Sequence, residues 1–389
     1  MSDLSACRAI LGNLIAMPTV SADSNLAIIS YIADRLEHAG ARVEVMPSAC
    51  GTKANLFATL GPDRPGGLMF SGHTDVVPVA DQPWTSDPFR MEEREGLLYG
   101  RGTCDMKGFI AACLARLDDM AEAAQSRPIH FAFTHDEEVG CLGARSLAGV
   151  LRDREARPSL AIIGEPTDMA PIEGHKGCCE YTVTFTGSEG HGSAPERGVN
   201  AVEYAARYVA RLLELRQALI DRAPAGSRFD PPHSTINVGA LKGGHAHNVI
   251  AGHAVLDWEM RPVVPADMDF VKADLAALVR DGLLPEMQRV FPGAGIATEV
   301  IGEVAGLIPM DSNAARDLIQ RLTGANGAGV VPFGTEAGLF QEIGMEVVIC
   351  GPGSIAQAHR PDEFVSLDQL GQCLDLLGRI CGAVRSGTV

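Results

Sequence analysis

The sequence has no run of apolar residues that approaches the roughly 18–20 residues of a membrane span. It also lacks a basic stretch followed by an apolar segment at its start, because Asp3 is the first charged residue. A secretory signal peptide would need both features. We therefore expect a cytoplasmic protein that does not insert into a membrane.

The ten cysteines are scattered, and none of them forms a C-x-x-C pair. Cys178 and Cys179 are adjacent, which does not suit an ordinary disulfide between them. This pattern favours reduced thiols and agrees with an intracellular protein.

Basic residues are few relative to acidic ones, with 32 Lys and Arg against 49 Asp and Glu, and the formal net charge is -17. An acidic surface repels phosphate groups, so nucleic acid and anionic membranes are poor partners. Apolar residues make up 46% of the 389 residues. A chain of this size exceeds what a single core usually supports, so we expect two domains.

The first part of the chain alternates between strand and helix patterns. Strands are expected at 43–45, 55–60, 67–71, 129–134 and 160–164, and helices at 25–40, 109–120 and 146–152. Strands that alternate with helices indicate an α/β domain with a mixed, mostly parallel sheet.

The pattern changes near Gly177. A strand with alternating burial, CEYTVTFTG, is followed by a helix at 200–219, strands within 234–244 and 253–262, and a helix at 267–279. The α/β pattern then resumes near residue 308, with a helix at 314–322, a strand at 346–350 and a last helix at 367–384. We therefore predict a catalytic domain of residues 1–177 and 304–389, and an inserted α+β domain of residues 178–303.

Several polar segments follow predicted buried strands, where open α/β sheets bind their ligands. In GLMFSGHTDVVPV, the strand runs into His73 and Asp75. A histidine beside an aspartate is often a purely structural pair. In the functional interpretation, His73 binds a metal ion and Asp75 holds the other ring nitrogen, as metal-bound histidines commonly require.

The segment LYGRGTCDMKGF surrounds Asp105 with three glycines. Glycine allows the backbone to approach another group closely. A phosphate-binding loop is excluded, because the G-x-x-x-x-G-K-[ST] spacing is absent.

Two further segments supply glutamates. In IHFAFTHDEEVG, Asp136, Glu137 and Glu138 form either a solvated loop or a functional pair, in which one Glu binds metal and its neighbour acts as a base. In LAIIGEPTD, Glu165 directly follows the predicted buried strand 160–164, which has four apolar residues. A carboxylate there is costly without a partner, and a metal ion would provide one.

His359 follows another strand end in VVICGPGSIAQAHRPDEFV. Two histidines with three or four carboxylates suit zinc, manganese or cobalt, and ligand softness does not choose among these metals. Without cations, carboxylates placed this close together would repel one another strongly.

In this order, SGHTDVVPV, GRGTCDMKG, DEEVG and GEPTD resemble the M20 metallopeptidase family, and the likeness covers essentially the whole chain. The resemblance implies a catalytic domain of zinc-peptidase-like architecture with an inserted lid and dimerisation domain. It also implies a homodimer formed through the inserted domain. Two divalent ions are implied as cofactors, with Zn²⁺ expected and Co²⁺ or Mn²⁺ as alternatives.

The resemblance assigns five metal ligands: His73 and Glu165 on one ion, Glu138 and His359 on the other, and Asp105 on both. It implies a cis peptide bond between Asp105 and Met106. It further implies that Glu137 is the general base and that Asp75 orients His73.

The segment TGSEGHGSAPERGVNAVEYA resembles the family's lid, in which a histidine polarises the scissile carbonyl. That residue would be His191, often supplied by the partner subunit. Asn248 and Arg261 fall where the family binds the carboxylate of the substrate. The guanidinium fork of Arg261 matches a carboxylate, although a surface charge at a strand end is the alternative interpretation.

The implied reaction is hydrolysis of an amide bond in a small N-acylated amino acid. His175-Lys176-Gly177 and the sequence Gly-Thr-Glu-Ala at 334–337 resemble family members that convert N2-acetylornithine to ornithine and acetate in arginine biosynthesis. In that case Glu336 is expected to face the cationic side chain of the substrate. A succinyl-diaminopimelate desuccinylase, an aminoacylase and a dipeptidase are alternatives within the family. A non-catalytic binding protein is disfavoured, because every expected ligand and Glu137 are present.

Overall fold

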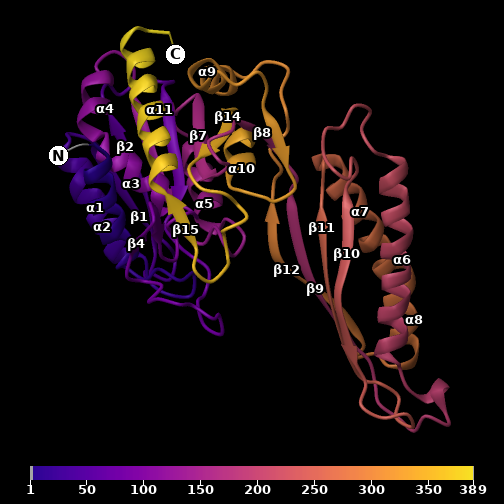
Figure 1. Ribbon diagram of the computed structural model, residues 1–389. Helices are drawn as coiled ribbons and strands as arrows, with labels where there is room; N and C mark the ends of the chain where they lie inside the picture. Colours follow the sequence, from indigo (N-terminus) through magenta and orange to yellow (C-terminus); the bar gives the residue numbers. More distant parts are fainter. Residues whose placement is uncertain (1–2, 389) are drawn as a thin grey trace. The chain divides into compact units, whose positions relative to one another are not determined.

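The computed structural model describes residues 3–388, which divide into two compact units (Figure 1). Unit 1 contains the described residues up to Gly174, together with Pro309–Val330 and the residues from Thr335 onwards. Unit 2 contains His175–Ile308 and Val331–Gly334. Within residues 3–388, no helix is both long and apolar enough to cross a membrane.

A mixed eight-stranded sheet organises unit 1, in the order β1-β2-β6-β3-β7-β14-β8-β13. Its strands are β1 (Arg42–Pro47), β2 (Ala54–Leu60), β3 (Leu68–His73), β6 (Ile129–Thr134), β7 (Leu160–Pro166), β8 (Ile172–His175), β13 (Gly329–Val331) and β14 (Glu346–Gly351). Strands β6, β3, β7 and β14 are parallel neighbours, whereas β1, β2 and β8 pair in antiparallel fashion. The predicted α/β class with a mixed sheet is confirmed.

Helices cover this sheet, so every residue of β3, β6 and β7 is buried. The helices of unit 1 are α1 (Asp3–Ile15), α2 (Leu26–His38), α3 (Lys107–Ala115), α4 (Leu117–Ala123), α5 (Leu142–Arg152), α9 (Ala314–Thr323), α10 (Ala337–Glu342) and α11 (Leu367–Arg385). A small sheet adds β4 (Glu92–Arg94), β5 (Leu97–Tyr99) and β15 (Phe364–Ser366). Strands buried on both faces read as continuous apolar runs, which is why β3 and β7 are visible in the sequence.

The helix predicted at 109–120 is two helices, α3 and α4, which meet at Arg116. Arg116 has φ -108° and ψ 14°, outside the helical range, and it ends one helix and begins the next. Its guanidinium forms ion pairs with Asp3 (2.8 Å) and Asp119 (2.7 Å). The sequence contains no proline or glycine at this position, so periodicity alone predicts one continuous helix.

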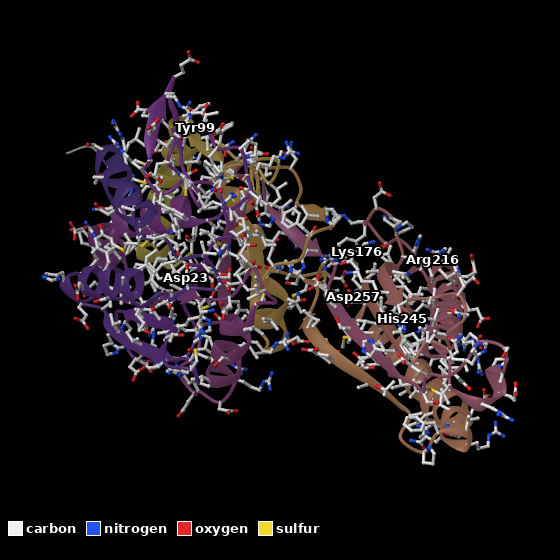
Figure 2. The ribbon with its side chains drawn as sticks, turned by 90° about the horizontal axis from the view of Figure 1, so that it is seen from below. Asp23, Tyr99, Lys176, Arg216, His245 and Asp257 are labelled. Atoms are coloured by element: carbon white, nitrogen blue, oxygen red, sulfur yellow. The ribbon has the colours of Figure 1, made fainter. Side chains whose placement is uncertain are left out.

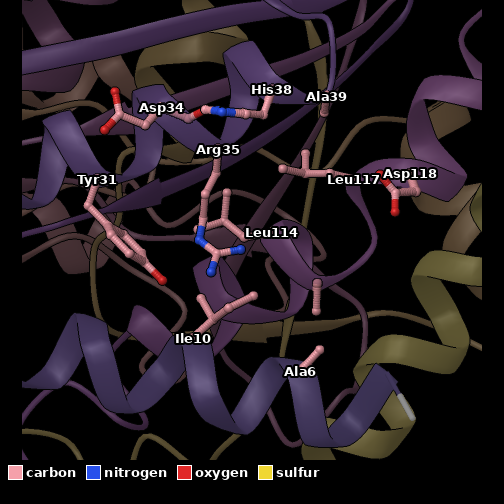
Figure 3. Close-up of a pocket in the computed structure, with 11 residues that line it drawn as sticks. Ala6, Ile10, Tyr31, Asp34, Arg35, His38, Ala39, Leu114, Leu117 and Asp118 are labelled. Atoms are coloured by element: carbon pink, nitrogen blue, oxygen red, sulfur yellow. The ribbon is translucent and has the colours of Figure 1, made fainter. Parts of the chain in front are cut away.

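A pocket of about 560 Å³ lies among helices α1, α2, α3 and α4 (Figure 3). The side chain of Arg35 extends into its centre between Tyr31, Leu114 and Ile10. The guanidinium carbon of Arg35 lies 5.0 Å from the centre of the Tyr31 ring. None of the site residues predicted from the sequence lines this pocket.

Unit 2 is built on a four-stranded antiparallel sheet in the order β10-β11-β9-β12. Its elements are β9 (Cys178–Thr186), α6 (Ala201–Asp221), β10 (Thr235–Gly243), β11 (His253–Arg261), α7 (Pro265–Ala277), α8 (Leu284–Val290) and β12 (Gly295–Val304). As the alternation in β9 predicts, Tyr181, Val183 and Phe185 are buried on one face. On the other face, Thr182 donates a hydrogen bond to Asp257, which is labelled in Figure 2 (2.7 Å).

His130 on β6 is a buried histidine with a structural role, and it is 2% exposed. Its Nε2 donates to the carbonyl oxygen of Gly66 (3.2 Å), and its Nδ1 accepts from the hydroxyl of Thr59 (3.0 Å). Burial lowers the pKa of His130 to about 4. The neutral ring is therefore the form that fits this site.

Because the pKa of His130 lies below the roughly 6.5 of an unfolded histidine, its stabilising contribution is present above about pH 6.5 and is lost as the pH falls towards 4. Gln can replace the Nε2 donor to Gly66 without titrating. When the pH is lowered from about 7.5 to about 5, both proteins should lose free energy of unfolding. We expect the loss for the native protein to exceed that for His130→Gln by roughly 2 kcal/mol. Urea unfolding at both pH values measures this difference, and equal losses would contradict the assignment.

Candidate metal centre

The predicted ligand residues of unit 1 converge because their strands are parallel neighbours. His73 ends β3, and Glu165 lies near the end of β7. Glu138 follows β6, and His359 follows β14. The carboxyl ends of these strands meet at one edge of the sheet, which is where open α/β sheets place their sites. The sheet order thus gathers residues that are far apart in sequence.

Asp105 lies between the two histidines. Its Oδ1 is 3.0 Å from Nε2 of His73, and its Oδ2 is 3.4 Å from Nε2 of His359. The Oε1 of Glu165 lies 3.8 Å from His73 Nε2, and the Oε2 of Glu138 lies 3.0 Å from His359 Nε2. The five residues thus form two groups that share Asp105. The peptide bond between Asp105 and Met106 is cis, as the family resemblance implies.

Two sets of residues could each hold an ion, because within each set the ligand atoms all lie within 4.8 Å of one another. One set is His73, Asp105 and Glu138, and the other is His73, Glu137 and Glu165. Glu137 therefore lies close enough to serve as a ligand as well as a base.

Two causes shift the pKa values of this group, burial in a poorly solvated volume and the close contacts among its charged groups. Burial raises the pKa of Glu137 to about 8. Burial and the neighbouring Asp105 raise the pKa of Glu165 well above its usual range. Hydrogen bonds with Asp105 and Glu138 raise the pKa of His359 to about 10.

Asp105 behaves in the opposite way. Although burial favours its neutral form, the contacts from His359 and His73 hold the pKa of Asp105 below its usual range. A carboxylate that stays ionised between two imidazoles has the chemistry of a bridging ligand. The whole set offers carboxylate oxygens and imidazole nitrogens, and divalent cations would relieve the repulsion among its carboxylates. The donor set therefore fits two divalent ions.

Asp75 contacts His73 mainly through its backbone. The Nδ1 of His73 donates to the carbonyl oxygen of Asp75 (2.9 Å), whereas the nearer carboxylate oxygen of Asp75 is 3.7 Å away. The carboxylate instead accepts from the hydroxyl of Ser21 (2.7 Å) and from the backbone N–H groups of Glu137 (3.1 Å) and Glu138 (3.3 Å). Asp75 thus holds the turn that carries both glutamates, in addition to fixing the tautomer of His73.

Glu336 is completely buried within unit 1. Its two carboxylate oxygens accept from the hydroxyls of Ser71 on β3 (2.5 Å) and Thr134 on β6 (2.7 Å). These two strands lead to His73 and to the Glu137 turn. The observed contacts of Glu336 are therefore internal to the domain, and its contact with a substrate stays a prediction.

In unit 2, the structure brings the segments of His191 and Asn248 together. The N–H of Gly192 donates to the carbonyl oxygen of Asn248 (2.7 Å), and His191 forms a β-bridge with Val249. His191 and Asn248 are both exposed. Arg261 ends β11 at a separate position, where its Nε and Nη2 donate to Glu259 (3.0 and 2.8 Å).

Sequence reasoning missed several residues that support the centre. Ser21 binds the carboxylate of Asp75, and the thiol of Cys141 donates to Oε1 of Glu137 (3.3 Å). Glu363 is a buried carboxylate near His359 that binds the loop of Asp105. In the sequence, Glu363 is one acid of an Asp-Glu pair, and nothing distinguishes it from a solvated residue.

The fold and the candidate ligand set are those of a metallohydrolase, and the chain belongs to peptidase family M20/M25/M40, whose family model matches residues 69–382. Two relatives, the acetylornithine deacetylases of Photorhabdus laumondii and Proteus mirabilis, are 37% and 38% identical to it over 377 residues. In both comparisons the match covers 94% of each chain.

Solved structures show the same fold at low sequence identity. The aminopeptidase PepT of Bacillus cereus has a TM-score of 0.72 and 19% identity, and the match covers 98% of each chain. The YXEP protein of Bacillus subtilis, described as a dinuclear metal-binding peptidase of the M20 family, has a TM-score of 0.63 and 16% identity, with 99% of each chain covered. These likenesses establish the fold alone.

Neighbouring glutamates provide a test of the division of roles. We expect Glu138→Gln to lower the metal content after dialysis, because it removes a ligand beside His359. Glu137→Gln should retain metal but lose turnover by at least about 10²–10⁴-fold, as expected for a lost general base. Elemental analysis and initial rates measure the two properties. Identical behaviour of the two variants in both assays would refute separate roles.

Proposed function

We propose that the protein is a metal-dependent deacetylase that hydrolyses N2-acetylornithine to ornithine and acetate. The observation that carries the proposal is the similarity to proteins named acetylornithine deacetylase over 94% of both lengths. The ligand group around Asp105 supports a hydrolytic reaction. Arginine biosynthesis is the corresponding pathway. We place the protein in the cytoplasm, which agrees with the free thiols of all ten cysteines.

The proposed centre holds two divalent ions, with Zn²⁺ as the expected metal and Co²⁺ or Mn²⁺ as alternatives. The ligands are His73 and Glu165 on one ion, Glu138 and His359 on the other, and Asp105 on both. Two such ions supply Lewis acidity, which polarises the amide carbonyl and lowers the pKa of a water molecule.

Glu137 is the proposed general base. Its carboxylate lies within 4.8 Å of ligand atoms of His73 and Glu165, so it would be within reach of a water molecule in the centre. Glu137 takes a proton from the water and returns it to the amine of the leaving amino acid. Asp75 keeps the base in place through the backbone N–H of Glu137, and the Cys141 thiol contacts its Oε1.

His191 is proposed to bind the carbonyl oxygen of the scissile amide. The backbone N–H of Ser193 donates to Nδ1 of His191 (3.2 Å), so the neutral ring carries its proton on Nε2. The hydroxyl of Ser193 also contacts Nδ1 (2.7 Å). In this tautomer, His191 can donate a hydrogen bond from Nε2. Stabilisation of a developing oxyanion requires such a donor.

Unit 2 is the proposed lid and dimerisation domain, in which Asn248 and Arg261 bind the carboxylate of the substrate. The proposed homodimer forms through this unit, and His191 acts in the site of its own chain or of the partner. Glu336 is the proposed contact for the ammonium group of ornithine. Lys176, labelled in Figure 2, donates to the carbonyl oxygens of Pro231 (2.8 Å) and His233 (2.9 Å), so we assign it a structural role.

A substrate panel tests the proposed function. The metal-reconstituted protein should hydrolyse N2-acetylornithine with a higher kcat/KM than other acetyl-amino acids, succinyl-diaminopimelate or dipeptides. Ornithine and acetate release can be followed by chromatography, with chelator-treated protein as the control. A preference for succinyl-diaminopimelate, for acylated neutral amino acids or for dipeptides would assign the corresponding alternative activity. Binding without turnover of any of them would indicate a binding protein.

Replacement of His191 tests its role in the transition state. We expect His191→Ala to reduce kcat by about 10²–10³-fold, as deletion of an oxyanion donor does, with little change in KM. His245→Ala, in an exposed loop of the same unit, is the matched control. Metal content should stay unchanged in both variants. Equal kcat values for the two variants would exclude His191 from catalysis.

Mixing His191→Ala with Glu137→Gln, which are both expected to be inactive, identifies the subunit that supplies His191. If the partner supplies it, mixed dimers of His191→Ala and Glu137→Gln contain one site with both groups and recover part of the activity. Verified subunit exchange without recovery would place His191 in the site of its own chain.

A further inference from the structure

Glu363 is a buried carboxylate, 1% exposed, that has no part in the reaction proposed above. Its Oε1 accepts the backbone N–H groups of Cys104 (2.8 Å) and Asp105 (3.1 Å). Its Oε2 accepts the backbone N–H of Gly102 (3.1 Å) and an N–H of the Arg101 guanidinium (2.7 Å). Four donors, three of them from the backbone, therefore converge on one side chain.

The backbone donors lie in the loop 100–106, between β5 and α3, which consists of turns. Buried N–H groups that lack a partner destabilise a fold, and no neighbouring strand pairs with this loop to supply one. Glu363 satisfies three of them. Because this loop carries Asp105, a side chain rather than secondary structure fixes the position of the bridging carboxylate.

The same network reaches the segment of His359, four residues before Glu363. The guanidinium of Arg101 donates to the carbonyl oxygen of Arg360 (3.2 Å) and to Oε1 of Gln82 (2.6 Å). The Nε2 of Gln82 then donates to the carbonyl oxygen of His359 (3.0 Å). One set of contacts thus holds both backbone segments, the one that carries Asp105 and the one that carries His359.

Arg101 and Glu363 form a buried ion pair, and we call this pair the clamp. Each residue is 1% exposed. The guanidinium carbon of Arg101 lies 5.0 Å from the centre of a Trp84 ring. A buried pair of this kind is sensitive to the loss of one partner, because the other charge remains in a poorly solvated place. The two residues therefore act together.

We propose that Glu363, with Arg101 as its counter-ion, is a positioning residue that sets the separation of Asp105 and His359. Through that separation, the clamp determines the affinity for the ion that these two residues share with Glu138. This inference rests on the metal centre of the proposed function. Outer contacts that orient ligands typically change metal affinity by about 10–100-fold, so a clear effect is expected.

The test compares Glu363→Gln with the native protein. The amide NH₂ of Gln either faces the donors of Gly102 and Arg101 or those of Cys104 and Asp105, so two of the four contacts are lost. In chelator-treated protein, we expect the backbone amides of residues 100–106 to exchange at least about 10-fold faster, measured by hydrogen-exchange mass spectrometry. The affinity for Co²⁺ at one of the two sites, measured by visible absorption, should fall by about 10–100-fold.

Glu173→Gln is the matched control. Glu173 lies on β8, is 5% exposed and forms an ion pair with Arg316 (2.8 Å). Its replacement also breaks an ion pair of a buried glutamate in unit 1, although the Arg316 side chain is 16% exposed. We expect it to lower the melting temperature without changing exchange in residues 100–106 or the affinity for Co²⁺. Equal effects of the two variants would overturn the proposal, because they would reflect general destabilisation.

Two further outcomes are decisive. If Glu363→Gln does not fold, Glu363→Asp replaces it, since the shorter carboxylate keeps its charge but cannot reach both pairs of donors. Native exchange rates and native Co²⁺ affinity in either folded variant would overturn the proposal. A native protein that binds no Co²⁺ would refute the proposed metal centre, and the exchange measurement, which needs no metal, would still decide whether the clamp holds the loop.

Discussion

Four carboxylates, those of Asp105, Glu137, Glu138 and Glu165, are held close together at the end of a buried sheet, and their mutual repulsion is the constraint on which unit 1 depends. Like charges in a poorly solvated volume would move apart or take up protons. The fold prevents the first outcome by fixing the backbone beneath each carboxylate. Positive charge from imidazoles disfavours the uptake of protons by the carboxylates. In the proposed enzyme, two divalent ions would add to this effect.

The fixing contacts come from two directions. Asp75 and Ser21 hold the turn of Glu137 and Glu138, and Glu363 holds the loop of Asp105. In both cases one buried carboxylate accepts several backbone N–H groups. This arrangement gives an irregular loop the same kind of backbone pairing that a strand obtains from its neighbour. Glu165 needs no such support, because it lies within β7.

The strands that carry the proposed ligands could be predicted from the sequence because both faces of these strands are buried. Continuous apolar runs mark β3 and β7, and polar residues directly after such runs stand out against them. The alternation of buried and partly exposed residues in β9 marked the start of the antiparallel sheet of unit 2, because one face of this strand is buried and the other is not. What could be predicted therefore depends on near neighbours in the sequence.

The remaining features depend on partners that are distant in the chain. The break between α3 and α4 coincides with ion pairs of Arg116, one of them to Asp3. The partners of Glu363 lie about 260 positions away, and those of Glu336 lie on two different strands. No local pattern records such pairs, so the sequence suggested a substrate contact for Glu336 and nothing for Glu363.

The order of segments along the chain has a consequence for biosynthesis. Strand β14 lies between β7 and β8 in the sheet, yet it follows the whole of unit 2 in sequence. On the ribosome, β7 and β8 emerge first, and unit 2 is translated before their common neighbour exists. His359 and Glu363 emerge later still. The nascent chain can therefore fold unit 2 as a separate body, but it acquires the full set of proposed ligand side chains only after β14 has been translated.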